Sequence, residues 1–190
     1  EWLAPWGVTE AANLGILDVL RTDAGGFHVP WFVGYDENVP SEQARATASD
    51  LRKVHSIGTG PLCAGHPEMC AALSKAAEAS GGTFFRGVKE ISVSAGEPPS
   101  IRFLWDGRAV EWRPKLIVGA DGRTSTVRRQ LALPVLQDTP HNLIGGMLVE
   151  GVPEWPEDTW DFGTEGRLHH LTFPRGHGKL RLYACYDFGD

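Results

Sequence analysis

The chain lacks several features that would place it in a familiar structural or catalytic class. Its three cysteines, Cys63, Cys70 and Cys185, include no Cys-x-x-Cys pair, which disfavours both a disulfide framework and a structural zinc site. No apolar run approaches the roughly 20 residues that span a bilayer, and no signal peptide is visible. There is no Gly-x-Ser-x-Gly elbow and no cysteine–histidine pair with a recognisable orienting partner. We therefore expect a cytoplasmic protein with reduced thiols and without stable membrane insertion.

Charge and size narrow the class of partner. The 190 residues carry a formal net charge of −6, which disfavours nucleic acid as a partner. The hydrophobic content of 42% is enough to bury a sizeable core in one or two domains. Nothing in the sequence specifies an oligomeric state.

One segment carries most of the functional information. Leu116–Val118 is apolar, too short for a helix and β-branched at two of three positions, which predicts a parallel strand buried on both faces. Gly119-Ala120-Asp121-Gly122 then predicts a tight turn, and Thr124 or Ser125 can cap a helix that runs to Gln130.

This strand–turn–helix order predicts a cofactor site. The carboxyl ends of the strands in an open α/β sheet form the ligand crevice, so Asp121 is placed where it can hold a cofactor hydroxyl. The amino terminus of the following helix is suited to a phosphate group.

The same residues carry a family resemblance. Gly119 to Arg128 reads Gly-Ala-Asp-Gly-Arg-Thr-Ser-Thr-Val-Arg and resembles the GADGxxSxVR segment of the FAD-dependent aromatic hydroxylases, the p-hydroxybenzoate hydroxylase-like flavoprotein monooxygenases. Residues 5–15 are similar to the helix that follows the family's ribose-binding strand, and residues 65–73 to the helix beside the flavin. The three segments keep the family's order and spacing, so the resemblance extends over nearly the whole chain.

Other family segments are missing. The chain has neither the opening Gly-x-Gly-x-x-Gly with its acidic second strand nor the later Gly-Asp-Ala-Ala-His segment. Gly189-Asp190 does not supply the latter, because the preceding Arg181–Phe188 is expected to be a strand in mid-course. The chain also begins without Met. We therefore expect an internal fragment of a longer enzyme, incomplete at both ends.

The resemblance implies an α/β fold in which a Rossmann-like FAD/NAD(P)-binding domain is interleaved with a β-sheet-rich substrate domain. Residues 1–30 and 61–134 would belong to the FAD-binding domain. Residues 31–60 and 138–190 would belong to the substrate domain, whose sheet roofs the hydroxylation site.

Local patterns predict the individual elements. One helix is expected from Pro5 until Gly25-Gly26, and another from Pro67 to just before Gly81-Gly82. Asp106-Gly107 predicts a hairpin, whereas the stretch from Ser41 to Leu51 fits either helix or loop. Short strands are expected at residues 31–33, 83–86, 89–94, 101–105, 109–113, 143–150, 160–162, 168–173 and 179–186.

The resemblance also implies an activity, that of an FAD-dependent monooxygenase that uses NAD(P)H and dioxygen to hydroxylate an aromatic or similar small molecule. Reduced nicotinamide would deliver hydride to FAD, and a flavin C4a-hydroperoxide would pass oxygen to the ring, so most of the chemistry belongs to the cofactor. No catalytic residue or metal ligand is assigned. The implied cofactor-binding residues are Asp121, Gly122, Gly119, Ala120, Ser125 and Arg128.

Each candidate residue also has a purely structural interpretation. Asp121 can simply cap its turn, because Asp-Gly is a common turn pair, and Ser125 is expected to cap the helix. Arg128 can anchor that helix as well as face a cofactor. His169 and His170 are adjacent in an expected strand and point to opposite faces, which disfavours a shared metal ion.

Two alternatives to the hydroxylase interpretation stay open. Related halogenases, epoxidases and polyprenyl reductases have similar Asp-Gly segments. A non-catalytic α/β binding module with the same fold belongs to a different functional class.

Overall fold

The computed structural model describes residues 2–187, so the Gly189-Asp190 pair lies outside the described residues. The chain forms two compact units, which we describe separately. Unit 1 comprises Glu1–Gly81 and Pro140–Asp190, and unit 2 comprises Gly82–Thr139. These units are defined by internal contacts, whereas the expected FAD-binding and substrate domains are defined by what they bind. The expected division therefore stays a prediction.

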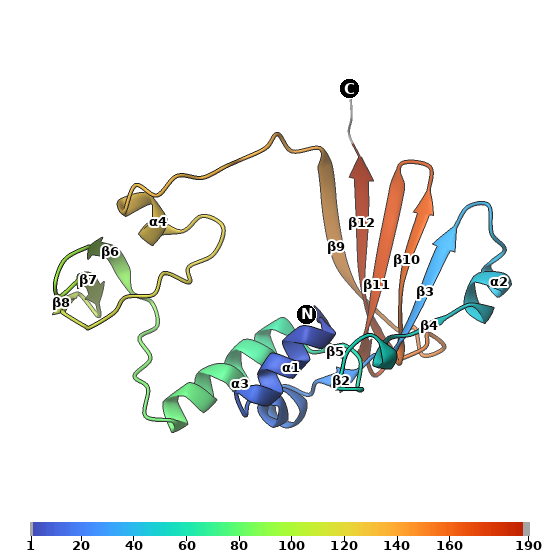
Figure 1. Cartoon of the computed structure of the whole chain (residues 1–190), viewed down its shortest axis with the longest axis horizontal. Helices are drawn as coiled ribbons and strands as arrows, with labels where there is room; N and C mark the ends of the chain where they lie inside the picture. Colours follow the sequence, from blue (N-terminus) through green and yellow to red (C-terminus); the bar gives the residue numbers. More distant parts are fainter. Residues whose placement is uncertain (1, 188–190) are drawn as a thin grey trace. The chain divides into compact units, whose positions relative to one another are not determined.

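Unit 1 is organised around a six-stranded sheet with the strand order β4-β3-β10-β11-β12-β9 (Figure 1). β3 pairs with β10 in parallel, and the other neighbours are antiparallel. All six strands come from residues 31–60 and 138–190, the two ranges expected to share a sheet. The strands are β3 (Trp31–Asp36), β4 (Ser49–Asp50), β9 (Asn142–Glu150), β10 (Thr159–Glu165), β11 (Leu168–Gly176) and β12 (Lys179–Asp187).

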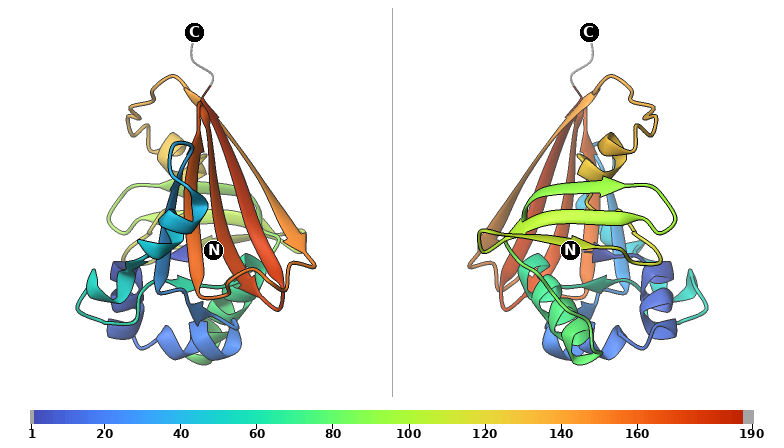
Figure 2. Two further views of the ribbon diagram at one scale, coloured as in Figure 1. Left: turned by 90° about the vertical axis from the view of Figure 1, so that its right-hand side faces the viewer. Right: turned by 90° about the vertical axis from the view of Figure 1, so that its left-hand side faces the viewer.

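Helices lie near one end of these strands (Figure 2). α1 (Pro5–Asn13) is followed by a short π-helix, η1 (Val19–Asp23), and α3 (His66–Ala79) packs beside them. The single helix expected from Pro5 to Gly25 is therefore wrong, because the chain leaves the helix at Leu14 and Gly15 takes a positive φ of 70°. The expected helix at Pro67 is confirmed, with Pro67 in its first turn.

The core of unit 1 joins these helices to a small second sheet. β1 (Trp2–Leu3), β5 (Leu62–Cys63) and β2 (Phe27–His28) form this three-stranded sheet in that order. Leu62 packs with three buried residues of the helical segments, Val8, Ala11 and Leu20.

A short helix, α2 (Ser41–Ala46), and a 3₁₀ turn, η2 (Leu51–Lys53), occupy the stretch that the sequence left undecided. Among residues 2–187, no helix combines the length and the apolar character needed to cross a membrane.

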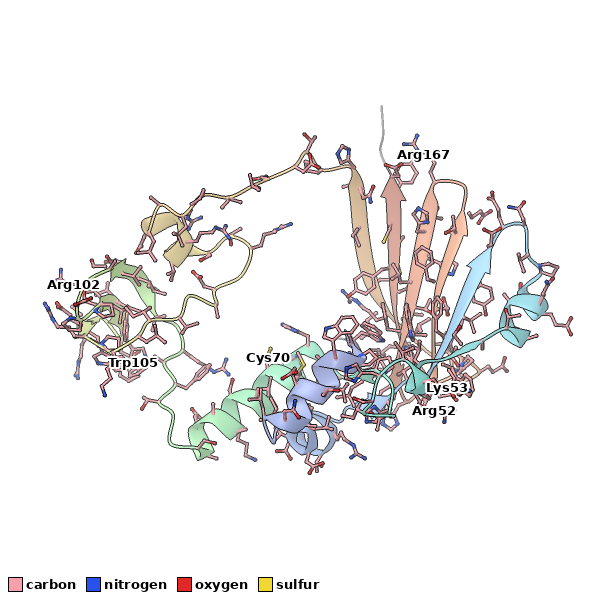
Figure 3. All side chains as sticks on the ribbon, in the orientation of Figure 1. Arg52, Lys53, Cys70, Arg102, Trp105 and Arg167 are labelled. Carbon is pink, nitrogen blue, oxygen red and sulfur yellow. The ribbon has the colours of Figure 1, made fainter. Side chains whose placement is uncertain are left out.

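Unit 2 contains a three-stranded antiparallel sheet, β6 (Lys89–Ser94), β7 (Ser100–Trp105) and β8 (Arg108–Trp112), and the helix α4 (Thr126–Gln130). The expected hairpin is confirmed: Asp106 and Gly107 have φ values of 48° and 72°, as a two-residue turn with the twist of its strands requires. Arg102 and Trp105 on β7 are labelled in Figure 3. Arg102 forms an ion pair of 2.7 Å with Glu111 on β8.

The strand expected at residues 83–86 is wrong. The Phe85 ring packs against three aromatic rings of the sheet, those of Phe103, Trp105 and Trp112, at centroid distances of 5.0–5.6 Å. The apolar side chains that suggested a strand at residues 83–86 therefore include one that covers the sheet. The backbone of these residues pairs with no strand.

Candidate functional site

The segment before the Asp-Gly turn differs from the expected buried strand. Leu116–Val118 is extended but forms no ladder with any strand among the described residues, and Leu116 and Val118 are 74% and 76% exposed. A short apolar run forms a strand only where a neighbouring strand supplies hydrogen-bonding partners, and none lies alongside this one. The prediction of a strand buried on both faces is therefore wrong for this structure.

The turn itself depends on two glycines. Gly122 takes a φ of 79°, a conformation that glycine adopts without steric cost. A Cβ atom at Gly119 would lie 2.8 Å from Cγ1 of Val127, so glycine lets the chain pass directly against α4. The sequence thus brings Asp121 back over the first turn of that helix.

Asp121 caps α4 with both of its carboxylate oxygens. The Ser125 hydroxyl donates to Oδ1, and the backbone N–H groups of Thr126 and Val127 donate to Oδ2 at 2.6 and 3.2 Å. The Ser125 hydrogen bond, reinforced by the two N–H groups, lowers the pKa of Asp121 below its ordinary value. The carboxylate is therefore charged at neutral pH.

This capping restricts what else the turn can bind. The Ser125 hydroxyl also accepts from the Arg128 N–H at 3.0 Å, so the free N–H groups of the first turn already have side-chain acceptors. The expected phosphate site at this helix terminus is therefore not available in the structure. The Asp121 side chain nevertheless stays exposed to solvent, so its carboxylate is accessible to a ligand hydroxyl.

Two other predicted residues flank the exposed carboxylate. Arg128 donates from Nη2 to the Arg123 carbonyl at 2.6 Å, whereas its Nε is buried and has no hydrogen-bond partner. An orphaned buried donor is costly unless a further group satisfies it. Ala120 lies exposed between Gly119 and Asp121.

An apolar cavity of about 230 Å³ lies beside this turn within unit 2. One wall comes from Leu116 and Ile117, another from Val127 and Leu131 of the α4 segment, and the rest from residues 93–99.

A second group of polar residues lies within the six-stranded sheet of unit 1. Asp161 on β10 is only 2% exposed, and its Oδ2 accepts from the Thr172 hydroxyl on β11. Its Oδ1 lies 3.4 Å from Nε2 of His170 without hydrogen-bond geometry and has no other partner. The sequence analysis missed this group because Asp161 and Thr172 meet only through strand pairing. A carboxylate within the apolar Trp-Asp-Phe stretch was the one available signal.

The environment of Asp161 predicts a pH-dependent stability. Burial raises the pKa of Asp161 above its ordinary value, and the Thr172 bond and the charges of His170 and Arg45 only partly oppose this shift. Because the folded state binds the proton more tightly than the unfolded chain, this contribution to stability is complete at acid pH and is lost as pH rises through the raised pKa.

We therefore expect the unfolding midpoint of the wild type, relative to that of Asp161→Asn, to fall as pH rises above about 4, the ordinary pKa of aspartate. Thermal unfolding monitored by circular dichroism at several pH values measures this difference. Glu165→Gln, at the exposed end of the same strand, is the matched control and should follow the wild type. If the unfolding midpoints of the wild type and Asp161→Asn change with pH in parallel, this result would contradict a raised pKa of Asp161.

The remaining polar candidates do not form a catalytic group. His169 stacks on Phe162 and bonds to Thr164, whereas His170 faces Asp161, so the expectation that the two rings lie on opposite faces is confirmed. Burial raises the pKa of the Cys63 thiol to about 12, so it is no nucleophile. Across residues 2–187, no cluster of three or more histidine, cysteine or acidic side chains has the geometry to hold a metal ion.

Comparison with known sequences identifies one matching family. Residues 15–163 match the family described as "FAD binding domain". No curated protein matches the chain significantly.

Solved structures with the same fold cover nearly the whole chain. A flavoprotein/dehydrogenase from Cytophaga hutchinsonii has a TM-score of 0.77 at 12% identity, over 97% of this chain and 45% of that one. The p-nitrophenol 4-monooxygenase PnpA from Pseudomonas putida has a TM-score of 0.75 at 15% identity, over 98% and 47%. Klebsiella pneumoniae R204Q HpxO complexed with FAD has a TM-score of 0.66 at 16% identity, over 99% and 48%. The chain thus spans about half the length of the structures it matches, and its expected mixed α/β fold is confirmed.

Proposed function

This chain belongs to the FAD binding domain family, and from that premise we propose that it is part of an FAD-dependent monooxygenase acting on an aromatic small molecule. The observation that carries the proposal is the match over residues 15–163, which includes the whole Asp-Gly turn and α4. Neighbours of known structure include a p-nitrophenol 4-monooxygenase and a protein complexed with FAD. We also propose NAD(P)H as reductant and the cytoplasm as the location.

The residues at the turn fit a flavin cofactor. Asp121 is exposed and ionised, so it can accept a hydrogen bond from a hydroxyl group of FAD. The Nε of Arg128 is a buried donor without a partner, which a polar group of the cofactor can satisfy after a small side-chain movement. Gly119 and Gly122 keep the backbone free of side chains at the same place.

In the proposed reaction, the protein binds the cofactor and orients it. Bound FAD would supply the redox chemistry, receiving hydride from NAD(P)H and activating dioxygen. Asp121 would fix the position of the cofactor, and its own position is fixed by Ser125 and by the first turn of α4. The apolar surfaces of the site would limit the access of water.

Labelled dioxygen tests this proposal in the full-length protein. We expect NAD(P)H oxidation to be slow alone and to accelerate when a suitable phenol or related aromatic compound is added. The product of that compound should contain one oxygen atom from the gas, detectable by mass spectrometry.

Unlabelled products from every stimulating compound would remove the monooxygenase assignment and favour an oxidase or reductase. A full-length protein that bound no FAD would favour a non-catalytic binding module.

A further inference from the structure

A glutamine at the end of α4 joins this helix to the sheet of unit 2, where α4 packs against β6 (Figure 1). The Gln130 Oε1 accepts a hydrogen bond from the Val93 N–H, and its Nε2 donates to the Ile91 carbonyl, both at 2.7 Å. We infer that Gln130 is a positioning residue, which holds the cofactor-binding turn at Asp121 in place through α4. This role rests on the proposed function, because FAD is the ligand that the turn would bind.

The two hydrogen bonds lie at the outer edge of β6. β6 is the first strand of the β6-β7-β8 sheet, and its pairing with β7 is irregular between Lys89 and Ser92. Ile91 and Val93 are two residues apart, so their backbone polar groups point to the same side of the strand. A carboxamide offers one acceptor and one donor, as the backbone of a neighbouring strand does. Gln130 therefore takes the place of a neighbouring strand at this point.

α4 depends on such contacts because it is short. It comprises only five residues, none of which is buried, and isolated helices of fewer than about 12 residues are marginal in water. At its amino end, the side chains of Asp121 and Ser125 accept hydrogen bonds from the first turn. Gln130 is the last residue of the helix, so the two sets of side-chain hydrogen bonds hold opposite ends of α4.

This helix connects the Asp121 turn to the sheet. On the incoming side, Leu116–Val118 forms no ladder with any strand among residues 2–187. On the outgoing side, the Asp121 carboxylate is bonded to the first turn of α4, and Gln130 bonds the last residue of α4 to β6. The position of the carboxylate therefore depends on how firmly Gln130 holds the helix.

Apolar contacts between α4 and β6 do not fix this position by themselves. Val127 and Leu131 line the same cavity as Val93. Contacts of this kind are not directional, so they favour docking of the helix without specifying where along the strand it lies. Hydrogen bonds require defined distances and angles, and the two made by Gln130 select one position of α4 on β6.

FAD titration of the full-length protein tests this role. We expect Gln130→Ala to weaken FAD affinity by about 3- to 10-fold, because losing two hydrogen bonds at an exposed side chain lowers the population of docked α4 by about that factor. Gln137→Ala replaces another exposed glutamine, in the segment after α4, and should bind FAD as the wild type does. Equal dissociation constants for Gln130→Ala and the wild type would overturn the inference.

A second variant distinguishes positioning from stability. The Phe85 ring packs on Trp105 and Trp112, so Phe85→Leu should lower the unfolding temperature of unit 2. Because this change leaves Gln130 and its hydrogen bonds in place, FAD affinity should stay at the wild-type value at a temperature where all variants are folded. An equal loss of FAD affinity in Phe85→Leu and Gln130→Ala would show a contribution to stability alone and overturn the inference.

Gln130→Glu allows a rescue by pH and decides the question if Gln130→Ala does not fold. At neutral pH the introduced carboxylate can accept from the Val93 N–H but cannot donate to the Ile91 carbonyl, so FAD affinity should fall. Protonation restores one donor and one acceptor. The dissociation constant relative to that of the wild type should therefore return toward one as the pH falls from about 7 to about 4.

The comparison with the wild type at each pH removes the effects of other titrating groups. Charged residues near this contact on β6 and α4 are common to both proteins: Lys89, Glu90, Arg128 and Arg129. Asp121 is common to both as well. A relative dissociation constant that does not change with pH would overturn the assignment of both hydrogen bonds to the positioning role.

Hydrogen exchange separates this inference from the proposed function, because it needs no cofactor. In Gln130→Ala, the N–H groups of Thr126 and Val127 should exchange faster by about 3- to 10-fold, whereas Gln137→Ala should leave them unchanged. If the wild type binds no FAD, faster exchange in Gln130→Ala would remove the monooxygenase proposal and support the role of Gln130 in holding the turn. Unchanged exchange would overturn that role.

Discussion

Replacing Asp121 with alanine in the full-length protein is expected to weaken FAD affinity by about 10- to 150-fold, the range for losing a hydrogen bond to a charged group. The carboxylate of Asp121 stays exposed after capping α4, and we propose that a cofactor hydroxyl donates a hydrogen bond to it. Asp121→Asn retains the shape without the charge, so its affinity should lie between those of the other two proteins. Titrating the apo-proteins with FAD, at a temperature where all three are folded, measures the effect.

A separate variant distinguishes binding from capping. Ser125→Ala removes one hydrogen bond to the Asp121 carboxylate and the acceptor for the Arg128 N–H, but it leaves the carboxylate in place. We expect this variant to unfold at a lower temperature and to lose less FAD affinity than Asp121→Ala. Equal dissociation constants for the wild type, Asp121→Ala and Asp121→Asn would reduce Asp121 to a structural cap.

Truncating Leu62 to alanine is expected to lower the free energy of unfolding by about 2–5 kcal/mol. Leu62 is 2% exposed and packs against Val8, Ala11 and Leu20, so its removal leaves a cavity between β5 and the helices. Urea unfolding measures the change. Leu14→Ala is the control, because Leu14 is 71% exposed and its loss should alter stability by only about 0.5 kcal/mol. Similar costs for the two variants would show that this cluster does not contribute to the stability of unit 1.

Features that depend on neighbouring residues in the sequence were predicted correctly. The Asp106-Gly107 hairpin was found because both residues tolerate the positive φ that such a turn needs. The helix α3 was found because Pro67 suits a first turn and Gly81 follows the last one.

Features that depend on distant partners were missed. Leu116–Val118 has the composition of a buried strand. A strand forms only where a neighbouring strand offers hydrogen-bonding partners, and composition does not reveal whether such a neighbour is present. Asp161 and Thr172 meet through the register of β10 and β11. For the Asp-Gly turn, the sequence placed Asp121, Ser125 and the helix in the right order. The sequence could not show that the Asp121 carboxylate already accepts hydrogen bonds from the Ser125 hydroxyl and from the first turn of α4.

The parallel pairing of β3 with β10 has a consequence for how the protein is made. β3 ends at Asp36, but its partner begins at Thr159, so the ribosome must add the whole intervening chain before the two strands can join. At ordinary elongation rates this takes on the order of ten seconds. During that interval unit 2, which lies entirely between them, can complete its own local hairpin, whereas β3 keeps an unpaired edge toward β10. Nascent chains stalled before Thr159 should therefore aggregate or recruit chaperones more than nascent chains stalled after Glu165, in which β10 is complete.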